Sequence, residues 1–226
     1  QMDNNKYAII LAGGESRRMR SKVPKPLMSF NGKFLVCYSL ESFVGIVPIS
    51  NIILVVNNKH KGLYIILWFN YPEYNGIKTV IGGKERFDSV KNALAVLPDD
   101  GLVAIHDAAR PYVPKPLIRK GYKLAKANNC AIPYHKTYNS VRIKDDDKNL
   151  IVDRDDVMLI DTPQFFNISL LKQAYEQDYN DKFTDDASVW ESKNLPLTFF
   201  EGTKLNLKIT YPEDLILMSA ILENFY

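Results

Sequence analysis

Short apolar segments rich in β-branched residues alternate along the chain with segments whose apolar residues recur at helical spacing. Buried strands are predicted at 7–11, 52–56, 79–81 and 102–106. Helices are predicted at 34–43, 88–97 and 115–127. This alternation predicts an α/β, Rossmann-like fold, with a mainly parallel twisted sheet and helices on both faces. Such sheets bind ligands beyond the carboxyl ends of their strands, so the loops after the first and fourth strands are the expected site.

The second half of the chain departs from this alternation. Residues 140–144 alternate polar and apolar side chains, 145–149 form an acidic turn, and apolar residues return at 150–152. This pattern predicts a β-hairpin. We interpret it as a projecting arm at about 138–154 that embraces another subunit, and a solvated edge hairpin is the alternative.

Further patterns complete the expected organisation. Helical patterns return at 169–177, 185–192 and 212–223, and 206–210 alternates like a strand. No repeat or linker-like stretch divides the chain, so residues 1–226 are taken as a single domain that carries the arm.

Composition excludes several classes of function. Of the 226 residues, 46% are hydrophobic, which supplies a substantial core, and the net charge of +3 is too mild for a general nucleic-acid binder. The apolar run at 63–69 is too short to cross a bilayer, and no signal-peptide pattern is visible. Cys37 and Cys130 have neither zinc nor disulfide spacing. We therefore expect a cytoplasmic protein that binds neither nucleic acid nor membranes.

The loop that follows the first predicted strand carries the strongest signal for a ligand. Gly13 and Gly14 lack side chains, so backbone N–H groups can approach a phosphate there. The same loop carries four basic residues: Arg17, Arg18, Lys22 and Lys25. We interpret it as a phosphate-binding loop, and a glycine turn with solvated charges is the alternative.

Polar residues at the end of the fourth predicted strand suit a metal ion. Asp107 would face the glycine loop and could hold Mg²⁺. Arg110 either braces the loop or forms a structural ion pair, and His106 is interpreted as a hydrogen-bonded histidine at a strand end. Lys208, in an otherwise alternating segment, is expected to meet an anion unless it extends to solvent.

Two further segments combine turn and helix-capping residues. Gly82 and Gly83 precede a helix for which Asp88 or Ser89 is the expected cap, and the alternative is a wall that contacts a nucleotide. Thr162 and Thr184 also lie beside helix-initiating residues, and capping alone would explain Thr184 and Asp185.

Taken together, these segments resemble the family of 2-C-methyl-D-erythritol 4-phosphate cytidylyltransferases over nearly the whole chain. In chain order, the matching segments are Ala12–Gly14, Arg17–Met19 with Pro24–Lys25, Gly82–Gly83 with Arg86 and Ser89–Val90, His106–Pro111, Asp153–Arg154, Thr162–Gln164, Thr184–Asp185 and Lys208–Thr210. The resemblance implies a nucleotidyltransferase of the non-mevalonate pathway of isoprene biosynthesis. CTP and 2-C-methyl-D-erythritol 4-phosphate would be its substrates, Mg²⁺ its cofactor, and pyrophosphate and the CDP-alcohol its products.

The resemblance also implies a role for individual residues. The cationic groups around the reacting phosphates would be Arg18, Lys25 and Lys208. The nucleotide would be bound by Ala12, Gly13, Gly14, Gly83, Ser89 and Asp107, with Asp107 also the metal ligand. The second substrate would be bound by Ser140, Arg154, Thr162, Thr184, Asp185 and Arg110. In a homodimer of this family the arm crosses to the other subunit, so Ser140 and Arg154 would serve the partner's site.

The chain departs from the family pattern at a few positions. Ser16 stands where a glycine is usual, Pro26 where glutamine is usual, and Lys84 where an acidic residue is common. The arm carries Asn139 and Ser140 in place of the usual Asp-Thr. Two other functions stay open from the sequence: cytidylyl transfer to another polyol phosphate such as ribitol 5-phosphate, and nucleotide binding without catalysis.

Overall fold

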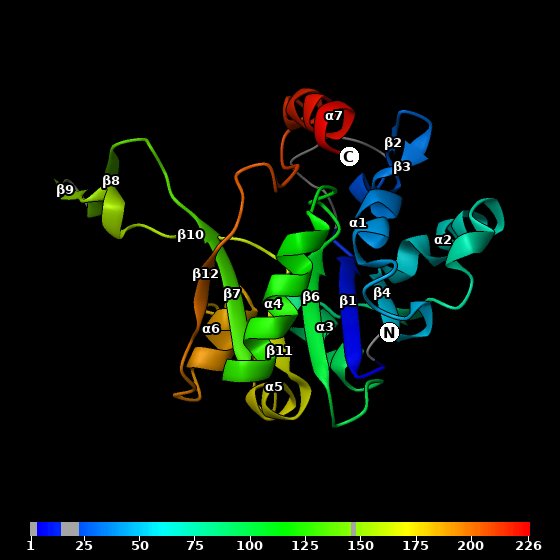
Figure 1. The fold of residues 1–226 in the computed structure, drawn as a ribbon, viewed down its shortest axis with the longest axis horizontal. Helices are drawn as coiled ribbons and strands as arrows, with labels where there is room; N and C mark the ends of the chain where they lie inside the picture. Colours follow the sequence, from blue (N-terminus) through cyan, green and yellow to red (C-terminus); the bar gives the residue numbers. More distant parts are fainter. Residues whose placement is uncertain (1–3, 15–22, 146–147) are drawn as a thin grey trace.

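A computed structural model describes residues 4–14, 23–145 and 148–226 of the chain. Within this part, eight strands form one sheet in the order β10-β7-β11-β6-β1-β4-β5, with β12 paired to β7 (Figure 1). These strands are β1 (Lys6–Ala12), β4 (Ile52–Val56), β5 (Lys78–Ile81), β6 (Leu102–Asp107), β7 (Cys130–His135), β10 (Leu159–Ile160), β11 (Gln164–Asn167) and β12 (Phe199–Glu201). A short pair, β2 (Ser29–Phe30) and β3 (Lys33–Phe34), lies outside this sheet.

Most helices lie between strands in the chain. The α-helices are α1 (Leu35–Phe43), α2 (Lys61–Asn70), α3 (Arg86–Leu94), α4 (Lys115–Asn128), α5 (Ile168–Ala174), α6 (Asp186–Glu191) and α7 (Asp214–Phe225). Helix α7, in contrast, follows the last strand and packs on α1. Short 3-10 helices are η2 (Lys25–Leu27), η3 (Ile49–Asn51), η4 (Asn58–His60), η5 (Pro72–Tyr74) and η6 (Arg154–Asp156).

The sheet is mainly parallel, which confirms the predicted α/β class. β1 pairs in parallel with both β4 and β6, and β4 pairs in parallel with β5. β11 enters antiparallel between β6 and β7, and β12 runs parallel to β7. The carboxyl ends of β1, β4, β5 and β6 therefore meet at one edge, where ligands of such sheets bind.

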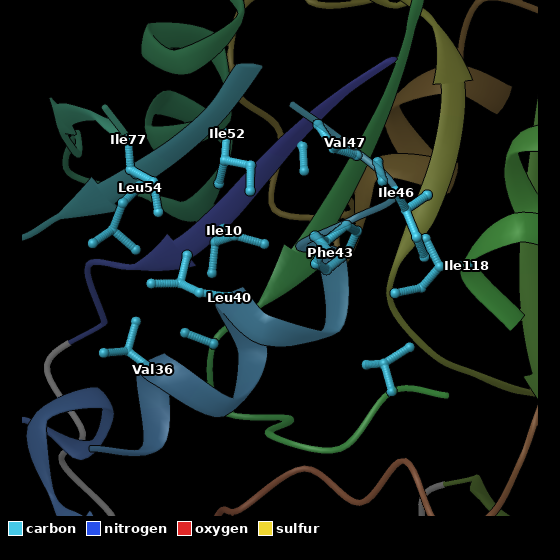
Figure 2. Packing of buried hydrophobic residues seen from close by; sticks show 14 of the residues in the cluster. Ile10, Val36, Leu40, Phe43, Ile46, Val47, Ile52, Leu54, Ile77 and Ile118 are labelled. Atoms are coloured by element: carbon cyan, nitrogen blue, oxygen red, sulfur yellow. The ribbon is translucent and has the colours of Figure 1, made fainter. Parts of the chain in front are cut away.

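The two-residue period of the strands divides the core between the two faces of the sheet. In β1, Ile10 packs with α1 and α4 on one face, whereas Ile9 packs with α3, α5 and α6 on the other. Figure 2 shows Ile10 beside Val36 and Leu40 of α1. All of these side chains are fully buried, and each such burial stabilises the fold by about 1.5–3 kcal/mol.

Several predicted elements agree with the structure to within one or two residues, and two predictions were wrong. The strands predicted at 7–11, 52–56, 79–81 and 102–106 are β1, β4, β5 and β6. The predicted cap of the third helix was wrong: α3 begins at Arg86 with Glu85 at its N-cap. The Asp88 carboxylate, placed in the first turn, accepts the Glu85 N–H at 3.0 Å, so the helix starts before Asp88 rather than at it.

The strand predicted at 206–210 is absent, and these residues form an extended loop. Their polar groups bond to side chains and to the loop after β6 rather than to a neighbouring strand. The Ile209 N–H donates to Ala109 O at 2.8 Å, and Arg110 donates to Asn206 O at 2.7 Å. Alternating polarity arises here because Ile209 is buried among side chains of α1 and α7, not because a sheet has two faces.

Helix α2 was not predicted, because its apolar residues lack helical periodicity. Tyr64 and Leu67 are buried, yet Ile65, Ile66 and Phe69 are exposed. The helix is therefore apolar on both sides, and no amphipathic stripe marks it in the sequence. No helix in the described ranges is long and apolar enough to span a membrane.

A hairpin stands away from the sheet, at the opposite side of the molecule from α2 (Figure 1). Its strands, β8 (Val141–Asp145) and β9 (Lys148–Val152), form a two-stranded sheet of their own within the range expected for the arm. Ile143, Leu150 and Ile151 are all more than half exposed. Contact with a second subunit stays a prediction.

Candidate active site

A cavity of about 780 Å³ opens at the carboxyl ends of the parallel strands. It is lined by the loop after β1, the residue after β4, the turn after β5, the end of β6 and one side chain from the 206–210 loop. The lining residues are Leu11, Ala12, Gly13, Gly14, Lys25, Pro26, Asn57, Gly83, Lys84, Glu85, Arg86, Ser89, Asp107, Ala109 and Lys208. The six residues predicted to bind the nucleotide all lie on this cavity, together with Lys25 and Lys208.

Backbone groups form much of one wall because side chains behind them hold the glycine turns. Ser89 Oγ accepts the Gly83 N–H at 3.1 Å and donates to Glu85 O at 3.1 Å. A Cβ on Gly83 would collide with the Cβ of Asp88, so the turn requires glycine at this position. Across the cavity, Asn57 Nδ2 donates to Gly13 O at 3.3 Å. Asn57 was not predicted, although it directly follows a predicted buried strand.

The two described lysines predicted to act on phosphates reach the cavity from opposite ends of the sequence. Lys25, in η2, is only 9% exposed, and its Nζ donates to Ile209 O at 2.6 Å. This bond connects η2 to the 206–210 loop, which carries Lys208. Arg18, together with Ser16, Arg17 and Lys22, lies outside the described residues.

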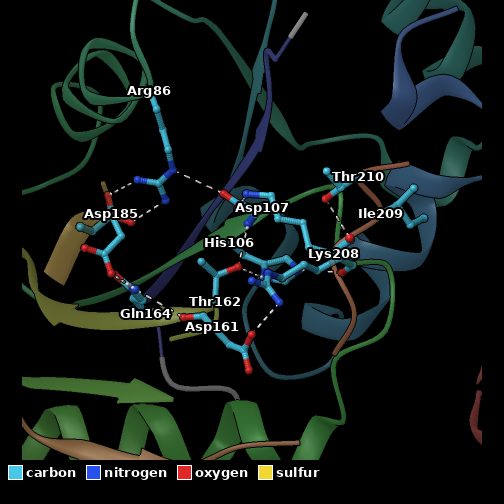
Figure 3. Close-up of polar contacts among 12 residues, drawn as sticks. Arg86, His106, Asp107, Asp161, Thr162, Gln164, Asp185, Lys208, Ile209 and Thr210 are labelled. Atoms are coloured by element: carbon cyan, nitrogen blue, oxygen red, sulfur yellow. Dashed lines mark hydrogen bonds and ion pairs between the residues drawn. The ribbon is translucent and has the colours of Figure 1, made fainter. Parts of the chain in front are cut away.

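Asp107 lies between two cations at the end of β6. Its carboxylate accepts from Lys208 Nζ at 2.7 Å and from Arg86 Nε at 3.5 Å (Figure 3). Burial would raise the pKa of the Asp107 carboxyl, but Arg86, Lys208 and Arg110 together hold it well below its usual range. The carboxylate is therefore ionised at neutral pH. The expectation that Lys208 meets an anion is confirmed, and that anion is Asp107.

The guanidinium of Arg86 forms an ion pair with the buried carboxylate of Asp186. Its Nη1 and Nη2 donate to the two carboxylate oxygens of Asp186, at 3.0 and 2.7 Å. Asp186 is fully buried and also accepts the Tyr175 hydroxyl at 2.7 Å. Burial opposes the charge on Arg86, yet Asp186 and Asp107 raise the guanidinium pKa well above its usual value. No role was predicted for Arg86 or Asp186, since 100 residues separate them.

His106 is a fully hydrogen-bonded histidine, as predicted. It donates from Nε2 to Arg110 O at 2.9 Å, because a carbonyl can only accept. Nδ1 is then an acceptor for the Thr162 hydroxyl at 3.0 Å, and Thr162 Oγ1 accepts the Asp107 N–H at 3.1 Å. Burial lowers the pKa of His106 to about 4, so the ring is neutral. Thr162 thus joins His106 to the backbone of Asp107.

The residues predicted to bind the second substrate do not line the described cavity. Arg110 Nη1 pairs with buried Asp161 at 2.6 Å, which confirms the structural ion pair left open for it. Asp185 is the N-cap of α6, where it accepts from the Ser188 N–H at 2.9 Å and from Gln164 Nε2 at 2.8 Å. Thr184, beside Asp185, is exposed, whereas Thr162 is buried, with 5% of its surface exposed.

The remaining two members of this set belong to the arm segment. Ser140 is exposed just before β8, and Arg154 is exposed just after β9. Arg154 Nη1 donates to Tyr138 O at 3.0 Å, so the two ends of the hairpin are joined near its base. Neither residue reaches the cavity of its own chain.

The residues at the cavity fit a metal ion that is shared with a substrate. In the described part of the chain no group of three or more His, Cys, Asp or Glu side chains could hold a metal by itself. Asp107 nevertheless offers one ionised carboxylate to the cavity. Mg²⁺ is commonly bound by one or two carboxylates and by phosphate oxygens of its substrate. A metal here would therefore depend on a bound polyphosphate.

Comparison with known proteins identifies the family. The family model for 2-C-methyl-D-erythritol 4-phosphate cytidylyltransferase matches residues 7–224. A protein of that name from Bacteroides fragilis is 39% identical over 219 residues, covering 95% of this chain and 98% of its own. The corresponding protein from Bacteroides thetaiotaomicron is 38% identical over 214 residues, with coverage of 95% and 98%.

Solved structures agree with the sequence relatives. The 4-diphosphocytidyl-2C-methyl-D-erythritol synthase of Anaerococcus prevotii superposes with a TM-score of 0.82 at 27% identity, covering 98% of this chain and 97% of its own. The 2-C-methyl-D-erythritol 4-phosphate cytidylyltransferase of Francisella tularensis gives 0.76 at 29% identity, with coverage of 96% and 100%. The chain belongs to the 2-C-methyl-D-erythritol 4-phosphate cytidylyltransferase family, and its activity is the cytidylyl transfer of the non-mevalonate isoprenoid pathway.

Proposed function

We propose that the cavity at the carboxyl ends of β1, β4, β5 and β6 binds CTP and catalyses transfer of its CMP group to 2-C-methyl-D-erythritol 4-phosphate. The observation that carries this placement is the pairing of an ionised Asp107 with Lys208 on the wall of a cavity whose other walls are glycine turns. Such a cavity offers backbone donors and cations to a polyphosphate. The proposed Mg²⁺ is held by Asp107 together with phosphate oxygens of CTP.

Recognition of the nucleotide would rest mainly on the backbone. The Ser89 hydroxyl is already committed to the Gly83–Glu85 turn, so Ser89 shapes the wall while backbone groups around Gly83 remain on the cavity. On the other side, Ala12, Gly13 and Gly14 allow close approach of the triphosphate.

The proposed reaction is an in-line attack by a phosphate-monoester oxygen on the α-phosphorus of CTP. The new P–O bond forms as the bond from the α-phosphorus to the bridging oxygen breaks, and pyrophosphate leaves with that electron pair. No protein nucleophile is needed, because a phosphate monoester is mostly a dianion at pH 7, its second pKa being about 6. Catalysis then depends on alignment and on stabilisation of developing charge.

Three cationic residues would perform that stabilisation. Lys25 and Arg18 would neutralise charge on the α-phosphate and the departing pyrophosphate, and Lys208 would align the attacking phosphate. Lys25 and Lys208 both border the cavity, which supports their assignment. Mg²⁺, when bound, would add positive charge beside the phosphates.

The second substrate would be bound at a composite site in a homodimer. Thr162, Thr184, Asp185 and Arg110 would come from one chain, and Ser140 and Arg154 from the arm of its partner. Exposure of Ile143, Leu150 and Ile151 on a hairpin that stands off the sheet supports contact between the arm and a second subunit. The free thiols of Cys37 and Cys130 support a reducing compartment, the cytoplasm.

Release of pyrophosphate tests the proposal directly. We expect rapid release from CTP with 2-C-methyl-D-erythritol 4-phosphate, at least about 100-fold faster than with ribitol 5-phosphate, because the second site discriminates between polyols. Chelation of divalent ions with EDTA should abolish release, and added Mg²⁺ should restore it. Release that persists in EDTA would refute the metal assignment. Equal rates with both alcohols would refute the substrate assignment.

A further inference from the structure

A chain of polar contacts leads from the cavity at Asp107 into the interior at Tyr175, through the half-buried side chain of Arg86 and the buried carboxylate of Asp186. It runs from Tyr175 through Asp186 and Arg86 to Asp107, with contacts of 2.7 Å, 2.7–3.0 Å and 3.5 Å in turn. Of the four side chains, Arg86 and Asp107 border the cavity, whereas Tyr175 and Asp186 do not. Burial of a carboxylate as deep as that of Asp186 costs free energy unless a cation is paired with it, and Arg86 is that cation.

The two hydrogen bonds from Asp186 set the orientation of the Arg86 guanidinium. Both terminal nitrogens of the guanidinium are bound by the two oxygens of Asp186, which fixes the plane of the group. In that orientation, Nε faces Asp107 (Figure 3). Tyr175, stacked on Phe87 with ring centroids 4.7 Å apart, holds Asp186 in turn.

Asp107 thus has two cationic partners of different mobility. The side chain of Lys208 is 43% exposed and can move, whereas that of Arg86 is held at its far end by a completely buried acid. A carboxylate that is itself only 13% exposed is costly to leave without a partner. While Arg86 stays in place, departure of Lys208 does not leave Asp107 unpaired.

We propose that Asp186 is a positioning residue, which fixes Arg86 against Asp107 so that Lys208 can leave Asp107 for the reacting phosphates. The inference rests on the proposed roles of Asp107 and Lys208. Without Asp186 the guanidinium loses its orientation, and Asp107 then competes more strongly with the reacting phosphates for Lys208, also when the proposed Mg²⁺ is bound. The step that suffers is therefore alignment of the attacking phosphate, not folding of the cavity or entry of CTP.

The substitution Asp186→Asn tests this role. It keeps the shape of the side chain but removes its charge and places an amide N–H opposite the guanidinium. We expect kcat to fall about 10- to 50-fold, with KM for CTP changed less than about threefold. The matched control is Asp99→Asn, which removes an acid that is exposed and pairs with Lys172 at the surface. The control should retain wild-type kcat. Circular dichroism and the Tm show whether each variant is folded, and a folded Asp186→Asn enzyme with kcat within about twofold of wild type would overturn the proposal.

A double-mutant cycle separates positioning from a general structural defect. If Asp186 acts by freeing Lys208, then Asp186→Asn should lower kcat by less than about threefold in a protein that already carries Lys208→Ala. Losses that multiply in the double variant would overturn the proposal. If Lys208→Ala alone keeps full turnover, the proposed role of Lys208 fails first, and the two failures are thereby distinguished.

A milder variant covers the case in which Asp186→Asn does not fold. Tyr175→Phe removes one hydrogen bond to Asp186 and retains the ring that stacks on Phe87. We expect kcat to fall about two- to fivefold, again without a matching rise in KM for CTP and again with the loss suppressed by Lys208→Ala. A wild-type kcat in Tyr175→Phe together with an unfolded Asp186→Asn would assign Asp186 to folding and overturn the proposal.

Discussion

Lys25 illustrates how one side chain can belong to both the fold and the site. Its ammonium lies on the cavity, and it also binds the carbonyl of Ile209, 184 residues away in the sequence. The same charge can hold the 206–210 loop near the glycine loop and lie beside a bound phosphate. Truncation of this residue therefore has two consequences, which can be measured separately.

We predict that Lys25→Ala lowers kcat by about 100-fold or more, because a charge beside the developing negative charge is removed. The variant should still fold, with a loss of about 1–2 kcal/mol from the free energy of unfolding for the missing bond to Ile209. Pyrophosphate release and urea denaturation measure the two effects. Lys59→Ala, at an exposed position of η4, is the control and should leave kcat unchanged. Near-normal turnover in Lys25→Ala would contradict the role assigned to this lysine.

Thr162 and Thr184 were both predicted to contact the second substrate, but the structure places them differently. The Thr162 hydroxyl joins His106 to the Asp107 N–H in the interior, whereas Thr184 is exposed. Contact of either residue with the substrate stays a prediction. Their different surroundings nevertheless make their contributions to stability distinct.

Thr162→Val should lower the free energy of unfolding by about 1–3 kcal/mol, because it leaves the His106 Nδ1 and the Asp107 N–H without their partner in the interior. Thr184→Val, the matched substitution, should change that free energy by less than about 0.5 kcal/mol, since its side chain is exposed. Urea denaturation of both variants checks the contrast. Equal stabilities would show that the interior hydroxyl contributes nothing to the fold.

At the scale of single elements, close approach of α4 to the sheet depends on one glycine. A Cβ on Gly121 would collide with the ring of Phe165, a fully buried residue of β11. Tyr122, the next residue of α4, packs edge-on against the same ring with centroids 5.0 Å apart. The helix therefore lies directly on β11, and a larger residue at position 121 has no room.

We predict that Gly121→Ala lowers the free energy of unfolding by about 1–3 kcal/mol, because the helix or the Phe165 ring must shift. Gly62→Ala in α2 is the matched control. It has no neighbouring atom within 4 Å of the new Cβ, so helix propensity should leave stability unchanged or raise it by up to about 1 kcal/mol. Thermal unfolding of the two variants measures this difference in stability. A Tm above wild type in Gly121→Ala would show that the helix can move away from the sheet without cost.

At the scale of the whole molecule, the arm and the cavity lie on separate parts of the chain. The proposed residues of the second-substrate site are divided between them, with Ser140 and Arg154 on the arm segment and the others near the carboxyl ends of the strands. A site divided in this way becomes complete when two chains assemble. Assembly and activity are therefore expected to be lost together.

Deletion of residues 141–152 should yield monomers whose turnover is at least about 100-fold below that of the intact enzyme, because Arg154 of the partner can no longer be placed at the site. Light scattering after size-exclusion chromatography measures the mass, and pyrophosphate release measures the activity. CTP should still raise the Tm of the shortened protein, since the cavity lies wholly within one chain. A dimer that survives the deletion would contradict the role of the arm in assembly.

The sequence by itself determined the α/β class, the four parallel strands that frame the cavity, the hairpin and the glycine turns on the cavity wall. These features follow from patterns within about ten residues, namely the strand and helix periods and the glycines after strands. The tertiary structure alone decided that Lys208 binds Asp107 from a loop rather than a strand, that Thr162 binds His106, and that Asp186 binds Arg86. These contacts join residues 56 to 101 positions apart. They depend on the order and register of the strands, which no local periodicity specifies.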